Sequence, residues 1–453
     1  MLQYIRKKIL YIKSSDFIKN IATLLSGNIL GYGINLVLLP IISRIYTQSA
    51  LGEYDLLISS ANIVLPILQL SLLLVIMIPS DEMVAKIICR IILYFTLIGS
   101  AIICCILFFL APGFYLFKLN VPYAYGLILF SGYLILYNLQ NIYYSYTNRK
   151  KLYSVLFWNP IIMSATNGIL SIVLGKCNGG SSGYMIGTLA SYAVAVMHMK
   201  KHVHPFQCEQ SPVKIYSVLK QYKKYPLVQL PSALVSNIAI QLPAQFLGRM
   251  FSVTILSGYT MACKILSVPV SLLAVPVNRV YYRTLIEKLE NGENAGEFAF
   301  TLVKNNIMMA FVPIGFLMIF GDIITGFFLG SEWAVSGVYI SILGVMYLLK
   351  YCSSCMSGTF VAVGRQDLSL GFSVFTLLLY GGCFIFAYRL ELGIIETMIF
   401  YAFFASLHEL MNLLLCMHCL QFPIIRYLKF VLKNILVGFS IVYLFCGIRY
   451  VLL

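Results

Sequence analysis

The stretch IILYFTLIGSAIICCILFFLA, residues 91–111, decides the class of this chain. It contains no charged side chain, and it has the length of about 20 residues that a helix needs to cross a bilayer. Similar runs follow one another along all 453 residues, of which 60% are hydrophobic and 11% are charged. A soluble protein of this size needs more polar surface than that. The sequence therefore predicts an all-α fold, a polytopic membrane helical bundle.

Thirteen apolar runs have the length of a membrane span, which lies within the expected range of 12–14 transmembrane helices. They cover residues 21–43, 54–78, 87–111, 123–147, 153–174, 180–199, 226–248, 255–280, 300–320, 335–363, 368–388, 393–418 and 434–451. The first run is long and lacks a small-residue cleavage site. We therefore interpret it as a retained span and not as a signal peptide.

The basic residues are distributed unevenly between the two sides that these spans define. If the N terminus is cytoplasmic, 22 of the 32 Lys and Arg residues lie in inner segments and six in outer ones. Positive charge favours the cytoplasmic side, so this asymmetry predicts a cytoplasmic N terminus. The net charge of +16 is mostly this asymmetry. It favours attraction to anionic membrane lipids and gives no reason to expect a nucleic-acid partner.

A weak internal repeat divides the chain into two halves. RIYTQSALGEY, residues 44–54, follows the first predicted span, and RMFSVTILSGY, residues 249–259, follows the seventh. Duplicated halves are typical of transporters that bind their substrate between them. We therefore expect two pseudo-repeated six-helix lobes around a central cavity. The expected segments are a basic cytoplasmic N terminus (1–20), an N-lobe (21–199), a cytoplasmic linker (200–225), a C-lobe (226–418) and an accessory C-terminal transmembrane segment (419–453).

Four basic residues lie inside or at the ends of apolar runs: Lys264, Arg279, Lys304 and Lys350. A charge near the bilayer centre costs about 2.5–3.5 kcal/mol on insertion scales, so the deepest of them should face water and an anion. Lys264 and Lys350 lie at mid-depth, and we expect them to line the cavity. The alternative is snorkelling or a pair with a carboxylate such as Glu409. Snorkelling is favoured for Lys304 and Arg279, which lie near the cytoplasmic ends of their spans.

Glu409 is the one carboxylate near the middle of a predicted span, and His408 lies beside it. It either couples transport to an ion, because a buried carboxylate can carry a proton, or forms a structural pair with a lysine or a neighbouring helix. Arg44 and Arg249, at equivalent outer helix ends, either contact substrate or anchor their helices. The C-x-x-C pair at residues 352–355 has no flanking ligands, and we expect no metal, no cofactor and no catalytic residues.

The opening FIKNIATLLSGNILGYGINLVLLPIISRIYTQSALGEYDLL, residues 17–57, has a first helix dotted with glycine, an LPIISRIYT exit and an LGEYDL entry into the second helix. It resembles the first helix pair of bacterial polysaccharide flippases of the Wzx type, in the multidrug/oligosaccharidyl-lipid/polysaccharide exporter superfamily. GSEWAVSG (330–337) and VAVGRQDLSL (361–370) extend the similarity to nearly the full length. The odd thirteenth span departs from the twelve or fourteen that are usual in the family.

The resemblance implies a multi-pass protein of the bacterial cytoplasmic (inner) membrane that is not an enzyme. Such proteins move oligosaccharide repeat units linked to undecaprenyl diphosphate, for O-antigen, capsule or exopolysaccharide, from the inner to the outer leaflet by alternating access. The expected partners are this lipid-linked oligosaccharide, membrane lipids and a proton or sodium counter-ion. The candidate substrate-binding residues are Lys264, Lys350, Lys304, Arg249 and Arg44, with Glu409 as the coupling residue.

Two other functions stay open at this point. A multidrug or cation antiporter of the same superfamily would favour acidic cavity residues, whereas the charges at mid-depth here are mainly basic. A membrane polysaccharide polymerase would carry a long outer loop with catalytic residues, whereas the longest predicted outer loop spans only residues 321–334.

Overall fold

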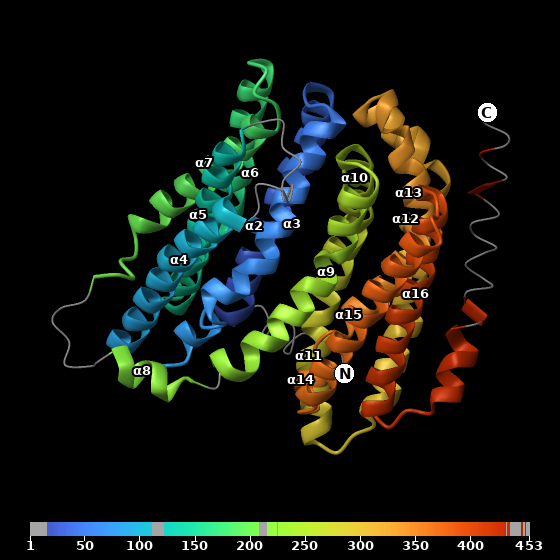
Figure 1. The fold of residues 1–453 in the computed structure, drawn as a ribbon. Helices are drawn as coiled ribbons and strands as arrows, with labels where there is room; N and C mark the ends of the chain where they lie inside the picture. Colours follow the sequence, from blue (N-terminus) through green and yellow to red (C-terminus); the bar gives the residue numbers. More distant parts are fainter. Residues whose placement is uncertain are drawn as a thin grey trace. The chain divides into compact units, whose positions relative to one another are not determined.

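The computed structural model describes residues 16–110, 122–207, 215–223, 225–431, 433–434, 445–446 and 449. The chain divides into two compact units, Met1–Leu234 and Val235–Leu453, and the boundary lies within helix α9. The elements before the boundary are α2 (Asp16–Ile45), α3 (Gln48–Gln69), η1 (Leu74–Met77), α4 (Glu82–Leu110), α5 (Tyr123–Arg149), α6 (Tyr153–Lys176), α7 (Gly180–Lys200), α8 (Ile215–Gln221) and η2 (Tyr225–Gln229) (Figure 1). The later elements are α9 (Leu230–Met250), α10 (Val253–Pro269), η3 (Val270–Ala274), α11 (Val275–Glu290), α12 (Ala295–Leu329), η4 (Ser331–Trp333), α13 (Ala334–Cys355), α14 (Thr359–Ala362), α15 (Gln366–Arg389) and α16 (Ile394–Cys419).

All regular structure within the described residues is helical. Nine helices in this part of the chain are long and apolar enough to cross a membrane, so the predicted class, an all-α polytopic bundle, is confirmed. Helices α5, α7 and α9 coincide with the predicted spans 123–147, 180–199 and 226–248 but are more polar than those nine. The predicted span 434–451 lies almost entirely outside the described residues.

The predicted span 54–78 is not one helix. Helix α3 ends at Gln69, because Leu70 and Ser71 have a left-handed backbone with φ of 48° and 53°. The short 3-10 helix η1 follows, and its Val75 and Ile76 are fully buried in a hydrophobic core of unit 1. These apolar residues therefore pack against the protein and do not extend the span. The predicted span 335–363 is likewise divided, because α13 ends at Cys355 and the short α14 follows.

The two repeated sequence stretches have the same structure at the start of a helix. Thr47 Oγ1 accepts a hydrogen bond of 3.2 Å from the backbone N–H three residues later and caps α3. Ser252 Oγ accepts the same bond, also of 3.2 Å, and caps α10. Such a side chain satisfies one of the N–H groups that a helix leaves unpaired at its start. Each cap follows its arginine, Arg44 or Arg249, by three positions.

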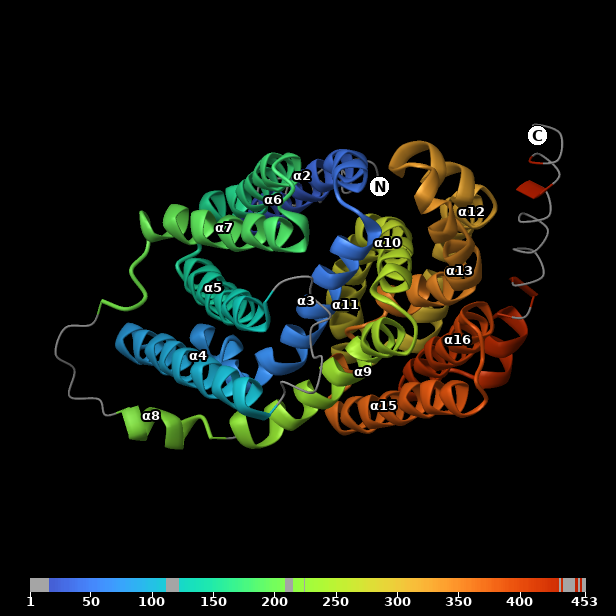
Figure 2. The same ribbon diagram turned by 45° about the horizontal axis from the view of Figure 1, so that its top comes forward.

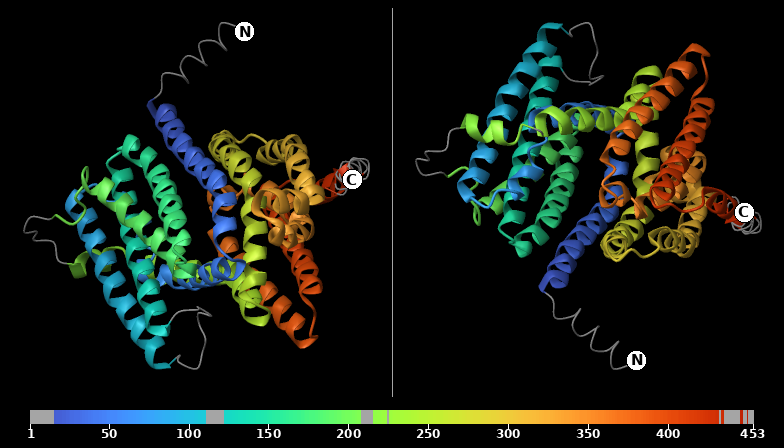
Figure 3. Two further views of the ribbon diagram at one scale, coloured as in Figure 1. Left: turned by 90° about the horizontal axis from the view of Figure 1, so that it is seen from above. Right: turned by 90° about the horizontal axis from the view of Figure 1, so that it is seen from below.

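Part of the pattern of helix contacts is also shared by the two units. In unit 1, α5 packs against α3, α4 and α7, and α7 packs against α6. In unit 2, α13 packs against α10, α12 and α16, and α16 packs against α15. Figure 2 shows α4 beside α5 in the first unit and α15 beside α16 in the second. The latter pair can be followed in orange and red in Figure 3.

Glycine residues bring α2 against α6. A Cβ atom at Gly27 would lie 2.5 Å from the carbonyl oxygen of Phe157, and one at Gly31 would lie 3.0 Å from Cβ of Pro160. On the other side of the contact, Gly168 lies under the side chain of Leu38. Small residues four positions apart let membrane helices approach at backbone distance, where dispersion forces hold them together.

In unit 2, Pro269 and Pro276 flank η3, a π-helical segment that joins α10 to α11. Proline donates no backbone N–H, so the regular α-helical pattern is interrupted at such positions. The predicted span 255–280 is therefore divided among α10, η3 and the first part of α11. Helical structure continues beyond this span to Glu290.

Candidate functional site

Polar residues of the candidate site meet where α10, α13, α15 and α16 of unit 2 pack together. Tyrosine rings from three of these helices surround the site. The ring centroid of Tyr401 lies 5.5 Å from that of Tyr380 and 6.3 Å from that of Tyr259. Phe384 stacks on the same Tyr401 ring at 5.4 Å. These aromatic rings place the neighbouring ionisable groups in a largely apolar environment.

Glu409 of α16 is largely buried in this environment, with 12% of its side chain exposed. The hydroxyl of Ser353, on α13, donates a hydrogen bond to Oε2 of Glu409. The second oxygen, Oε1, lies 3.8 Å from Nδ1 of His408. A carboxylate held between α13 and α16 can therefore respond to a change at either helix.

The hydrogen bonds around His408 indicate its tautomer. Its Nε2 lies 2.9 Å from Oγ1 of Thr376, and that hydroxyl donates its one proton to the carbonyl of Phe372 at 2.7 Å. Oγ1 must then accept, so Nε2 carries the ring hydrogen and Nδ1 of a neutral ring is an acceptor. Among the described residues, Nδ1 has no hydrogen-bond partner. Nδ1 and Oε1 of Glu409 are thus two acceptors that lie 3.8 Å apart, beyond hydrogen-bond distance.

Lys350 lies one helical turn before Ser353 on α13, so the two side chains share a face. Its Nζ lies 5.0 Å from the ring centroid of Tyr347, an arrangement that favours a cation. The ammonium group interacts electrostatically with Glu409 and His408. Lys350 and Glu409 therefore lie on helices that pack together, α13 and α16, but their charged atoms form no ion pair within 4.0 Å.

Lys264 is exposed on α10. The carbonyl of the preceding residue, Cys263, accepts a hydrogen bond of 3.4 Å from Tyr347, the ring that Lys350 approaches. Lys264 and Lys350 lie on α10 and α13, which pack against each other, and Glu409 lies on α16, which packs against α13. These three residues carry more positive than negative charge.

The other predicted residues lie elsewhere. Arg249, at the end of α9, is exposed and donates to Gln245 Oε1 at 3.0 Å on its own helix. Lys304 is exposed on α12, and Arg44 is exposed at the end of α2 in unit 1. Arg279 lies in α11, and its side chain is not among those that the structure describes.

Unit 1 contains a buried carboxylate that the sequence reasoning missed. Glu53, at the start of α3, is 3% exposed. It accepts a hydrogen bond of 2.6 Å from Ser181 in the first turn of α7, where the helix dipole also favours a negative charge. The repeat aligns Glu53 with Gly258, so this carboxylate belongs to one half only. Within the described residues, no group of three or more His, Cys, Asp or Glu side chains has a geometry that could hold a metal ion.

Residues 76–337, more than half of the chain, match a family described as "Polysaccharide biosynthesis protein". The chain belongs to this family. The chain is also similar to the teichuronic acid biosynthesis protein TuaB of Bacillus subtilis (strain 168), with 24% identity over 164 residues. The match covers 36% of this chain and about a third, 34%, of the length of TuaB.

Two solved structures are similar over most of the chain. The lipid II flippase MurJ, in an inward closed conformation, matches with a TM-score of 0.65 and 16% identity over 96% of this chain and 99% of its own. An inward-facing multidrug resistance MATE family transporter of the MOP superfamily matches with a TM-score of 0.60 and 17% identity, over 88% and 95%. These likenesses show the fold. The family match confirms the predicted link to polysaccharide biosynthesis, and the two structures have the fold that the resemblance implies.

Proposed function

We propose that this protein is a flippase that moves oligosaccharide linked to undecaprenyl diphosphate from the inner to the outer leaflet of the bacterial cytoplasmic membrane by alternating access. The observation that supports the proposal is that a polysaccharide biosynthesis protein carries Lys264, Lys350 and Glu409 within the apolar helices α10, α13 and α16. The N terminus is proposed to be cytoplasmic, as the distribution of basic residues predicts.

The chemistry of the cargo requires such a site. A lipid-linked sugar carries a diphosphate that must leave water, while its hydrocarbon tail can stay in the lipid. A charge in a low-dielectric region is costly unless it is paired, so the diphosphate needs cationic donors along its path. Lysine binds phosphate as a point charge, and Lys264 and Lys350 are the pair at mid-depth that we assign to this role.

Transport would be coupled to a proton because the diphosphate of the substrate and the carboxylate of Glu409 compete for the ammonium group of Lys350. The ammonium group of Lys350 acts electrostatically on Glu409. A bound diphosphate would attract the same ammonium group, and a carboxylate that loses a cation neighbour is more stable with a proton in its place. The proton would bind the carboxylate of Glu409, whose Oε1 lies 3.8 Å from Nδ1 of His408. Substrate and proton would then shift the inward and outward populations through their different affinities for the two states.

The test is export by variants in a strain that lacks its own flippase but makes the lipid-linked precursor. Lys264→Ala and Lys350→Ala should abolish surface polysaccharide, and the precursor should accumulate on the inner side. The matched control is Lys429→Ala, an exposed lysine of the same unit outside the site. Membrane protein levels should be equal in all strains. Full export by both lysine variants would refute the proposal.

A second arm of the experiment addresses the multidrug antiporter, because the fold is shared with MATE transporters. The same strain is exposed to cationic drugs with and without the protein. Unchanged susceptibility is expected, because the site carries more positive than negative charge and would repel organic cations. Drug resistance that depends on Glu409, without polysaccharide export, would favour the antiporter instead.

A further inference from the structure

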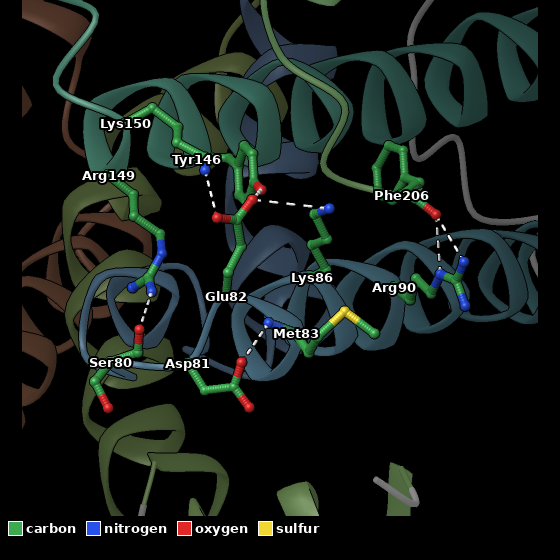
Figure 4. A network of polar contacts seen from close by, with 10 residues as sticks. All are labelled: Ser80, Asp81, Glu82, Met83, Lys86, Arg90, Tyr146, Arg149, Lys150 and Phe206. Atoms are coloured by element: carbon green, nitrogen blue, oxygen red, sulfur yellow. Dashed lines mark hydrogen bonds and ion pairs between the residues drawn. The ribbon is translucent and has the colours of Figure 1, made fainter. Parts of the chain in front are cut away.

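A second cluster of charged residues lies in unit 1, apart from the candidate site. It joins the start of α4 to the end of α5, as Figure 4 shows. Lys150 Nζ lies 2.5 Å from Glu82 Oε2, and Tyr146 donates to Glu82 Oε1 at 2.9 Å. Lys86 Nζ lies 3.8 Å from the same Oε1. We define the Glu82 cluster as Asp81, Glu82, Lys86, Arg90, Tyr146, Arg149 and Lys150.

Positive charge exceeds negative charge in this cluster. Arg149 donates to the carbonyl of Ile76 at 3.1 Å and to that of Ser80 at 3.4 Å. Arg90 donates twice to the carbonyl of Phe206, at 3.1 and 2.7 Å. Carbonyl oxygens accept hydrogen bonds from the two guanidinium groups but do not neutralise their positive charge. The four cations therefore share two carboxylates, and the exposed Lys151 follows directly in the chain.

An exposed apolar surface adjoins these cations. Leu74, Met77 and Ile78, in and after η1, are 69%, 45% and 53% exposed. The side-chain amide of Asn148, beside Arg149 on α5, lies 3.8 Å from the sulfur of Met77. The cations and the apolar residues are thus neighbours at the end of the helices that cross the membrane. Phosphate groups of lipids lie at this depth, with their acyl chains on the apolar side.

We propose that the Glu82 cluster binds the phosphate of an anionic membrane phospholipid. Lys86 of the cluster holds the phosphate together with Lys151, the exposed cation that follows Lys150 in the chain, and the acyl chains lie along Leu74, Met77 and Ile78. Glu82 is the internal anion with which the phosphate competes. Neither η1 nor this cluster takes part in the proposed transport site, so the lipid acts as a bound partner and not as cargo.

Because the lipid phosphate competes with Glu82, lysine variants and a Glu82 variant should change lipid affinity in opposite directions. Lys86 makes only one contact to Glu82, at 3.8 Å, so an ammonium group with three donors has capacity for another anion. Removing a lysine should weaken binding, whereas removing the charge of Glu82 should strengthen it. The pair between Lys150 and Glu82 remains in Lys86→Gln and Lys151→Gln, so these variants keep the contact that ties α4 to α5.

The experiment is native mass spectrometry of the full-length protein in detergent, titrated with phosphatidylglycerol, phosphatidylcholine or inorganic phosphate. Phosphatidylglycerol should bind more tightly than phosphatidylcholine. Each of Lys86→Gln and Lys151→Gln should weaken its binding about fivefold, since a basic residue near an anionic surface contributes on the order of that factor. Glu82→Gln should tighten binding, and Lys176→Gln, at the far end of α6, is the control that should leave it unchanged.

Three results would overturn the proposal. Equal binding of phosphatidylcholine would show that no anion is recognised. Inorganic phosphate that displaces phosphatidylglycerol at equal concentration would indicate a site for free anions and not for lipid. Unchanged binding in the two lysine variants together, with folding verified by an unaltered unfolding temperature, would place the lipid elsewhere.

Discussion

Replacement of Gly27 by alanine tests the contact between α2 and α6. The added Cβ would lie 2.5 Å from the carbonyl oxygen and 2.9 Å from Cα of Phe157, and both are backbone atoms that cannot turn away. The helices must separate, and overpacking of this kind costs about 1–3 kcal/mol. Alanine in place of glycine in a helix gains up to about 1 kcal/mol. The net loss of unfolding free energy should therefore be about 1–2 kcal/mol.

Gly33→Ala is the matched control, because it lies on the same helix and a Cβ there would meet nothing within 4 Å. Only the propensity gain applies, so this variant should be as stable as the parent or slightly more stable. The assay is the thermal unfolding midpoint of the detergent-purified protein. Gly27→Ala should lower the midpoint by about 1–2 °C, because the entropy of unfolding of so long a chain is large. The packing argument fails if the two variants unfold at the same temperature.

Three further predictions concern charge and pH. Glu409→Gln should leave substrate binding largely intact and flatten the dependence of export on the pH gradient, and normal export with an unchanged pH response would make Glu409 a packing residue. Thr376→Val should free the tautomer of His408 and alter the pH profile of export, whereas Thr376→Ser should keep the parent's profile. Outside the spans, the hydrogen bond from Lys288 lowers the pKa of Glu293. The stability from this pair is therefore present above the ordinary Glu pKa and is lost as the pH falls through the lowered one, so an acid titration of unfolding should lose this component in Lys288→Gln and keep it in the parent.

Hydropathy was sufficient to predict the helices because a backbone in lipid must satisfy its own hydrogen bonds. It was not sufficient for their ends. The run 54–78 is largely apolar, but Leu70 and Ser71 adopt a left-handed backbone, and Val75 and Ile76 after them are buried against other helices. Lipid and protein interior are equally apolar, so composition cannot distinguish a residue that faces one from a residue that faces the other.

The candidate site shows the same limit. The depth of Lys350 and Glu409 in their helices could be read from the sequence, but their proximity depends on how α13 packs against α16. The sequence did not reveal Glu53 as buried, because it lies at the end of a predicted span, where charged side chains usually reach water. Its partner Ser181 is 128 residues away. The sequence feature that could have identified this residue is a difference between the two repeats, in which Glu53 aligns with Gly258.

The order in which the site residues are synthesised has a consequence for biogenesis. Lys264 and Lys350 leave the ribosome before Glu409, which follows Ser353 by 56 residues. Until α16 is made, the lysines lack the carboxylate that faces them, and each lowers the tendency of its helix to partition into lipid. We expect α10 and α13 to stay near the insertion machinery until α16 arrives. The second half of the chain would then enter the membrane as a group of helices, and a chain that stops before α16 would be a substrate for membrane proteases.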